Sequence, residues 1–156
     1  MGDALSILLI TVYGLVAVKV HQWFTISKLG FKMETPQPFL THSHVYHMVE
    51  MILFVFAGIS LALSPSIPWY LGGLCLGAVW SGALWIGYKL GFNAFRRVLR
   101  EMIEDEENLK LADPAQHAEL YGGADHVARR AQLEKDARSS DRELRERLKF
   151  SIRWGL

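Results

Sequence analysis

The chain has 156 residues, 51% of them hydrophobic, and a formal net charge of +1, so its length suits one domain with an appendage. The near-neutral charge gives no electrostatic basis for nucleic-acid binding. The one cysteine, Cys75, excludes an internal disulfide framework and a CxxC metal or redox motif.

Charged residues are unevenly distributed along the chain. Only six of the first 88 residues are Asp, Glu, Lys or Arg, whereas 27 such residues follow from Lys89 onward. This change indicates a membrane-embedded part followed by a part that faces water. We therefore expect an all-α integral membrane protein, with a transmembrane domain over residues 1–91 and a charged helical tail over 92–156.

Three segments reach the length of roughly 20 mostly apolar residues that a membrane-spanning helix needs. They cover about residues 4–24, 45–64 and 67–88. The first lacks the basic start and the small-residue cleavage site of a signal peptide, so we expect it to be retained. A water-soluble bundle would need a polar face on each helix, and the second and third segments have none.

The basic residues predict how the three spans are oriented. Lys19, Lys28 and Lys32 lie in or beside the first connection, whereas the second connection, residues 64–68, carries no charge. We expect an outer N-terminus and a cytoplasmic C-terminus in the inner membrane. The arginines expected at anionic headgroups are Arg96, Arg97 and Arg100.

The third span is rich in small residues at four-residue spacing, which lets helices approach closely in lipid. Two such stripes predict two partners, namely the second span and a neighbouring subunit. We therefore expect a homo-oligomer or a subunit of a larger membrane complex. The stripes consist of Gly73, Gly77 and Ser81, and of Ala83, Gly87 and Gly91.

Glu50 is the one carboxylate well inside a span, where an ionised group is costly unless it is paired or functional. Lys19 should lie at a similar depth on the first span. The simplest interpretation is a Lys19–Glu50 ion pair, and the alternative is a carboxylate that handles protons or cations.

Histidines surround Glu50 in the stretch "THSHVYHMVEMILF". Imidazole and carboxylate groups are ligands for zinc, iron or copper, so a divalent metal is one hypothesis. Axial ligation of a haem by His21 and His47 is another. An ordinary interfacial role is the third, because HExxH and similar closed motifs do not occur. The candidate metal ligands are His21, His42, His44, His47 and Glu50.

The tail has local helix signals. The third helix should continue past Tyr88 along one apolar face, and Asp113-Pro114 should end it and start a short helix that runs to about Tyr121. Asp125 is expected to cap a helix to about residue 138, and Ser140 with Glu143 forms a capping box for the last helix. We expect that helix to be largely solvated or to dock on the membrane or a partner, and His117 and His126 to be surface residues.

No phosphate-binding glycine loop or nucleophile motif is present, so the sequence offers little support for an enzyme. The leading hypothesis is a small accessory or scaffolding subunit that associates through the third span and binds a cytoplasmic protein through its tail. The alternatives are a metal- or haem-binding membrane subunit and a pore-former, since three spans and a charged tail resemble the general layout of phage holins.

Overall fold

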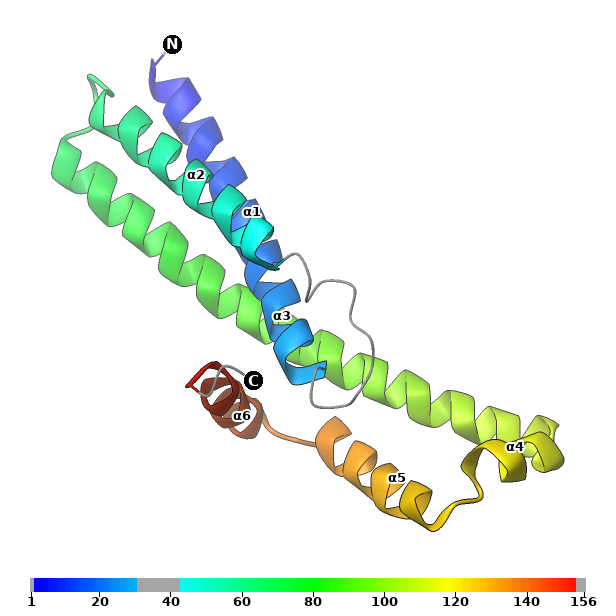
Figure 1. Cartoon of the computed structure of the whole chain (residues 1–156). Helices are drawn as coiled ribbons and strands as arrows, with labels where there is room; N and C mark the ends of the chain where they lie inside the picture. The colour runs from blue at the N-terminus through cyan, green and yellow to red at the C-terminus, as the bar shows by residue number, and fades with distance from the viewer. Residues whose placement is uncertain (1, 31–42, 154–156) are drawn as a thin grey trace. The chain divides into compact units, whose positions relative to one another are not determined.

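The computed structural model describes residues 2–30 and 43–153, and all regular structure in these two ranges is α-helical. The expected all-α class is therefore confirmed for this part of the chain. Its helices, in chain order, are α1 (Gly2–Gly30), α2 (Ser43–Ala62), α3 (Trp69–Ala112), α4 (Pro114–Tyr121), α5 (Ala124–Ala137) and α6 (Asp141–Arg153) (Figure 1).

Three of these helices are long and apolar enough to cross a membrane, as expected. The candidate spans are Asp3–Leu29, Val45–Ala62 and a part of Trp69–Ala112. α1 is longer than the predicted residues 4–24 because no glycine or proline interrupts the sequence between Gly14 and Gly30.

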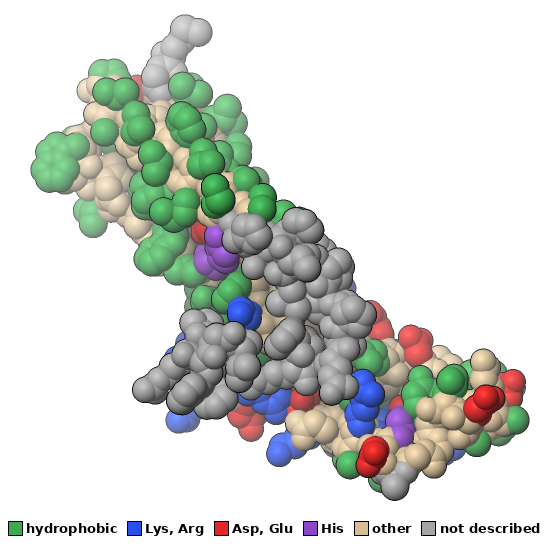
Figure 2. Space-filling model, in the orientation of Figure 1, with side chains coloured by type: hydrophobic (Ala, Val, Ile, Leu, Met, Phe, Trp, Pro, Cys, Tyr) green, Lys and Arg blue, Asp and Glu red, His purple; other side chains and the backbone are tan. Residues whose placement is uncertain are grey.

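The chain divides into two compact units, Met1–Gly91 and Phe92–Leu156, and α3 contributes to both. With 44 residues, α3 is about 66 Å long, roughly twice the thickness of the hydrocarbon core of a bilayer. Only its apolar first half can lie in that core. Hydrophobic side chains cover the visible surface of the first unit, and most of the visible charged side chains belong to the second (Figure 2).

Small side chains fill the centre of the first unit, and most large aliphatic ones lie on its outside. Three larger residues, Tyr13, Leu61 and Leu76, are buried there as well, and the Tyr13 ring packs edge-on against Phe54 with ring centroids 5.5 Å apart. This distribution suits a bundle whose solvent is lipid. The buried core consists of Tyr13, Ala17, Ala57, Leu61, Leu76 and Ala83.

Polar contacts join the start of α1 to the α2–α3 hairpin. Asp3 accepts hydrogen bonds from the hydroxyls of Ser64 and Ser66, the latter at 2.8 Å. The hydroxyl of Ser6 donates to the Ser60 carbonyl at 3.0 Å. The sequence shows Asp3 only as an isolated early charge, and its partners become apparent only when the hairpin places residues more than 60 positions away beside it.

Local helix signals in the second unit correspond closely to its helix boundaries. The Asp113 carboxylate accepts from the Gln116 backbone N–H at 3.0 Å and Pro114 begins α4, as predicted. α5 differs from the prediction, because Gly123 in an extended conformation is its N-cap and makes no side-chain cap bond. The expected capping residue, Asp125, lies instead within the first turn, where its charge complements the helix dipole.

α6 begins with the predicted capping box. The Ser140 backbone N–H donates to Glu143 Oε2 at 2.7 Å, and the Glu143 N–H donates to Ser140 Oγ at 3.4 Å. Most charged side chains of this helix are exposed, as expected of a solvated face, and its few apolar side chains form the other side. Leu144 and Leu148 are buried, because α6 folds back within the second unit and two turns of apolar side chains suffice to anchor it.

Candidate functional site

A carboxylate hydrogen-bonded by two imidazoles lies inside the helical bundle of the first unit. Glu50 Oε1 is 3.0 Å from His21 Nε2, and Glu50 Oε2 is 3.2 Å from His47 Nδ1. Glu50 and His21 are buried, at 6% and 8% exposure. Each carboxylate oxygen therefore has one imidazole partner, His21 on α1 for Oε1 and His47 on α2 for Oε2. We name these three residues the His–Glu–His cluster.

Helix periodicity explains how the three side chains meet. On α1 the buried residues Tyr13, Ala17, His21 and Thr25 recur every four positions, which places them on one side of the helix. On α2, His47 and Glu50 are separated by three positions, so their side chains are neighbours. The packing of α1 on α2 then brings His21 to the carboxylate.

Aromatic rings enclose the cluster. The His21 ring lies between the rings of His47 and Tyr88, with centroid distances of 5.9 and 5.8 Å. The Phe24 ring packs edge-on against His47 at 5.5 Å. His21 Nδ1 is buried and has no hydrogen-bond partner in the part of the chain that the structure describes. The neutral tautomer with no hydrogen on Nδ1 is therefore favoured, because an N–H at this position would lose its hydrogen bond to water on burial.

The arrangement has the chemistry of a proton-binding site. An ionised Glu50 with two neutral imidazoles carries a charge of −1, and one added proton makes the cluster electroneutral. The side chain of His47 is 37% exposed, whereas His21 is buried, so His47 is the more accessible of the two imidazoles.

The structure does not contain the expected ion pair between Lys19 and Glu50. Lys19 is exposed, and its ammonium group donates to Gln22 Oε1 at 3.4 Å on the same helix. Lys19 and His21 lie at a similar height on α1, but two residues correspond to a rotation of about 200° around a helix. His21 therefore faces α2, and Lys19 faces away from it.

The metal hypothesis gains no support from the described residues. They contain no group of three or more His, Cys, Asp or Glu side chains that could hold a metal ion. His42 lies outside the described residues, and only the helical backbone of His44 is described. The two imidazoles considered as haem ligands, His21 and His47, both contact Glu50 instead.

The two small-residue stripes of α3 have different surroundings. A β-carbon at Gly87 would lie 2.7 Å from the His21 β-carbon, and one at Gly91 would lie 2.5 Å from the Thr25 β-carbon. This stripe therefore packs on α1, which was not among the two partners expected from the sequence, the second span and a neighbouring subunit. By contrast, Gly73 and Gly77 are exposed, and a β-carbon at either would have no neighbour within 4 Å in the described part of the chain.

The second unit contains an ionic cluster that the sequence analysis missed. Arg130 on α5 contacts Glu106 at 2.8 Å, Glu107 at 2.6 Å and Glu134 at 3.0 Å. The ring nitrogens of His117 and His126, expected as surface residues, each lie 3.5 Å from Glu106. The only sequence signal was the i,i+4 spacing of Arg130 and Glu134, since the other contacts depend on how α5 packs on α3.

The three arginines expected at headgroups differ in their contacts. Arg96 donates to the Ser139 carbonyl at 2.9 Å, to Asn93 Oδ1 at 3.1 Å and to Asp141, so its guanidinium is used within the second unit. Arg97 and Arg100 are exposed.

No protein-family model, curated protein or solved structure matches this chain.

Proposed function

We propose that this protein is an accessory or scaffolding subunit of a membrane assembly and that it associates in the bilayer through the open side of α3. The observation that supports this is the contrast between the two small-residue stripes. Gly87 and Gly91 are covered by α1, whereas Gly73 and Gly77 have nothing near them. We call the side formed by Gly73, Gly77 and Ser81 the open stripe.

The covered stripe shows what small residues do in this chain. At Gly87 and Gly91 the two helices approach so closely that a methyl group would not fit. Glycine is otherwise unfavourable in a helix, by about 1 kcal/mol relative to alanine in water. Small residues at four-residue spacing in an apolar helix favour the same close approach by another helix. Gly73 and Gly77 have no such neighbour among the residues that the structure describes, which favours an intermolecular one.

The partner we propose is a second copy of α3. A Gly-x-x-x-Gly-x-x-x-Ser stripe is self-complementary, because two identical stripes can cross with their backbones in contact. The distribution of Lys and Arg favours an inner-membrane location with the second unit in the cytoplasm. There its exposed apolar side chains, Leu111, Leu120 and Val127, are available to a cytoplasmic protein.

The test compares Gly77→Ile with Ala78→Ile in full-length protein reconstituted in a mild detergent. Both positions are exposed on α3, but Ala78 lies about 100° away from Gly77 around the helix. We expect native mass spectrometry to show dimers for the wild type and for Ala78→Ile. Gly77→Ile should shift dissociation to at least tenfold higher protein concentration. A monomeric wild type, or equal dimerisation of the two variants, would contradict the proposal.

A second candidate function rests on the His–Glu–His cluster, namely that the subunit responds to protons. The titratable groups around Glu50 are the imidazoles of His21 and His47 and the hydroxyl of Tyr88 on α3. Lys19 faces away from α2 and contacts Gln22. Its test is the pH dependence of thermal stability in detergent between pH 5 and 8. His47→Gln should remove a transition that the wild type shows, whereas Lys19→Gln should retain it. Superimposable profiles of His47→Gln and wild type would exclude this function.

A further inference from the structure

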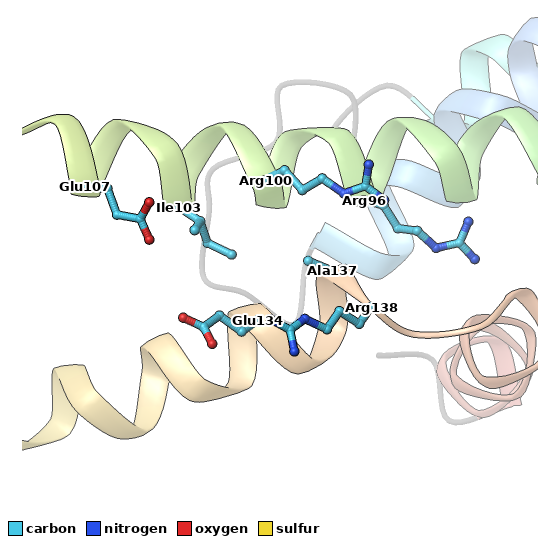
Figure 3. Close-up of a pocket in the computed structure, with 7 residues that line it drawn as sticks. All are labelled: Arg96, Arg100, Ile103, Glu107, Glu134, Ala137 and Arg138. Atoms are coloured by element: carbon cyan, nitrogen blue, oxygen red, sulfur yellow. The ribbon is translucent and has the colours of Figure 1, made fainter.

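The second unit contains a groove of about 660 Å³ between α3 and α5. Its two ends differ in charge, because basic side chains line one end and acidic side chains the other (Figure 3). Ile103 and Ala137 provide apolar surface in the wall. The lining residues are Arg96, Arg100, Ile103, Glu107, Glu134, Ala137 and Arg138.

The acidic end is already neutralised from within the unit. The Arg130 guanidinium donates to Glu107 at 2.6 Å and to Glu134 at 3.0 Å. At the basic end, Arg96 is similarly occupied, since it donates to Ser139, Asn93 and Asp141. These side chains have partners before any ligand arrives.

Arg100 and Arg138 are different. Both are exposed, and the guanidinium group of neither makes a hydrogen bond or ion pair with any residue in the described ranges 2–30 and 43–153. They come from different helices, Arg100 from α3 and Arg138 from the C-cap of α5. Folding therefore places both residues, each with an unpaired guanidinium group, in the lining of one groove.

We propose that Arg100 and Arg138 bind a phosphate group at the basic end of this groove. A guanidinium presents a planar set of N–H donors that matches phosphate oxygens, and two of them from opposite walls can hold one phosphate between them. Arg96 takes no part, because its guanidinium already donates to Ser139, Asn93 and Asp141. Glu107 and Glu134 at the acidic end are bound by Arg130 and would repel a phosphate, so the site is confined to the basic end of the groove.

Two sources could supply the phosphate, an anionic lipid headgroup or a soluble phosphorylated molecule. Arg100 follows Tyr88, the last residue of the apolar stretch, by 12 residues of continuous helix, about 18 Å. A lipid phosphate therefore reaches Arg100 only if α3 is strongly tilted, whereas a soluble one reaches it in any orientation. The chemistry of the site is the same in both cases.

The experiment uses the full-length protein with two probes. Inorganic phosphate is titrated by calorimetry, and retention of phosphatidylglycerol from mixed micelles is measured by native mass spectrometry. The test variant is Arg100→Gln combined with Arg138→Gln. The control is Arg142→Gln combined with Arg145→Gln, which removes two exposed arginines of α6 outside the groove.

We expect the test variant to weaken binding of at least one probe tenfold or more and the control to stay within twofold of the wild type. A loss confined to inorganic phosphate identifies a soluble ligand, and a loss confined to phosphatidylglycerol identifies a lipid. Equal losses in the test and control variants would show nonspecific attraction and overturn the proposal. Binding too weak to measure for both probes in the wild type would overturn it as well.

Discussion

Gly91 on α3 lies so close to Thr25 on α1 that a β-carbon at position 91 would come within 2.5 Å of the Thr25 β-carbon and 3.1 Å of the Gln22 carbonyl oxygen. The hydroxyl of Thr25 donates to the carbonyl of His21 at 2.7 Å, which fixes the side chain that a new methyl group would meet. The two helices can cross here only because residue 91 has no side chain.

The first prediction follows from this contact. Gly91→Ala should destabilise the first unit by about 1–3 kcal/mol, the usual cost of forcing an extra methyl group into a packed site. Thermal denaturation in detergent measures the effect. Gly73→Ala is the matched control, since it adds the same methyl group to the same helix with nothing within 4 Å. Equal melting temperatures for the two variants would show that α1 and α3 do not pack as described.

The second prediction separates the two possible partners of Glu50. Glu50→Leu removes the acceptor for His21 and His47 and should cost about 1–3 kcal/mol, because the buried imidazole N–H of His21 is left unsatisfied. Lys19→Gln should change stability by less than about 0.5 kcal/mol, because Lys19 is exposed. Chemical unfolding in mixed micelles measures both. A larger effect of Lys19→Gln would instead support the Lys19–Glu50 pair.

The third prediction concerns Arg130, which alone joins three glutamates of the second unit within the described residues. Arg130→Gln should destabilise the packing of α5 on α3 by about 1–3 kcal/mol, since it leaves Glu106, Glu107 and Glu134 to repel one another. Hydrogen exchange of the α5 amides should rise accordingly. The neighbouring exposed residue serves as control, and Arg129→Gln should leave exchange unchanged.

The fourth prediction concerns pH and the start of α6. The backbone N–H and the hydroxyl of Ser140 both donate to the Glu143 carboxylate, and these bonds hold the pKa of Glu143 below its ordinary value of 4.5. Because the pKa is lowered by folding, the stabilisation is present above the unfolded pKa and is lost as the pH falls through the folded one. A carboxyl NMR titration should show the lowered pKa.

Two variants check the origin of that shift. Ser140→Ala removes the hydroxyl donor and should move the pKa of Glu143 back toward its ordinary value. Glu143→Gln should keep the cap and remove its dependence on acid, because an amide oxygen also accepts from the backbone N–H. An unchanged pKa of Glu143 in Ser140→Ala would show that other groups lower it.

Local signals in the sequence were sufficient for much of the helical structure. The length of each apolar stretch predicted three helices able to span a membrane, and Asp113-Pro114 and Ser140–Glu143 predicted where two helices begin. Each of these signals acts within a few residues of itself, through backbone hydrogen bonds that the side chains complete. Such features can be inferred without knowing which helices touch.

The partner of Glu50 could not be inferred in this way. α1 is apolar nearly all round, so the sequence does not show which of its sides faces α2. Lys19 and His21 have nearly the same depth, and only the packing of Tyr13 and Ala17 against the other helices decides that His21 points inward. The same holds for Arg130, whose glutamates lie on α3 as well as on its own helix.

The polar contacts of Asp3 and His21 have a mechanical consequence for α1. They lie 18 residues apart, about 27 Å along the helix, close to the thickness of a bilayer's hydrocarbon core. One fastens the start of α1 to the α2–α3 hairpin, and the other fastens α1 to α2 about 27 Å further along the helix. α1 therefore cannot slide past its neighbours without breaking both contacts. In a thinner or thicker bilayer, the first unit should tilt as one rigid piece and keep the register of its helices.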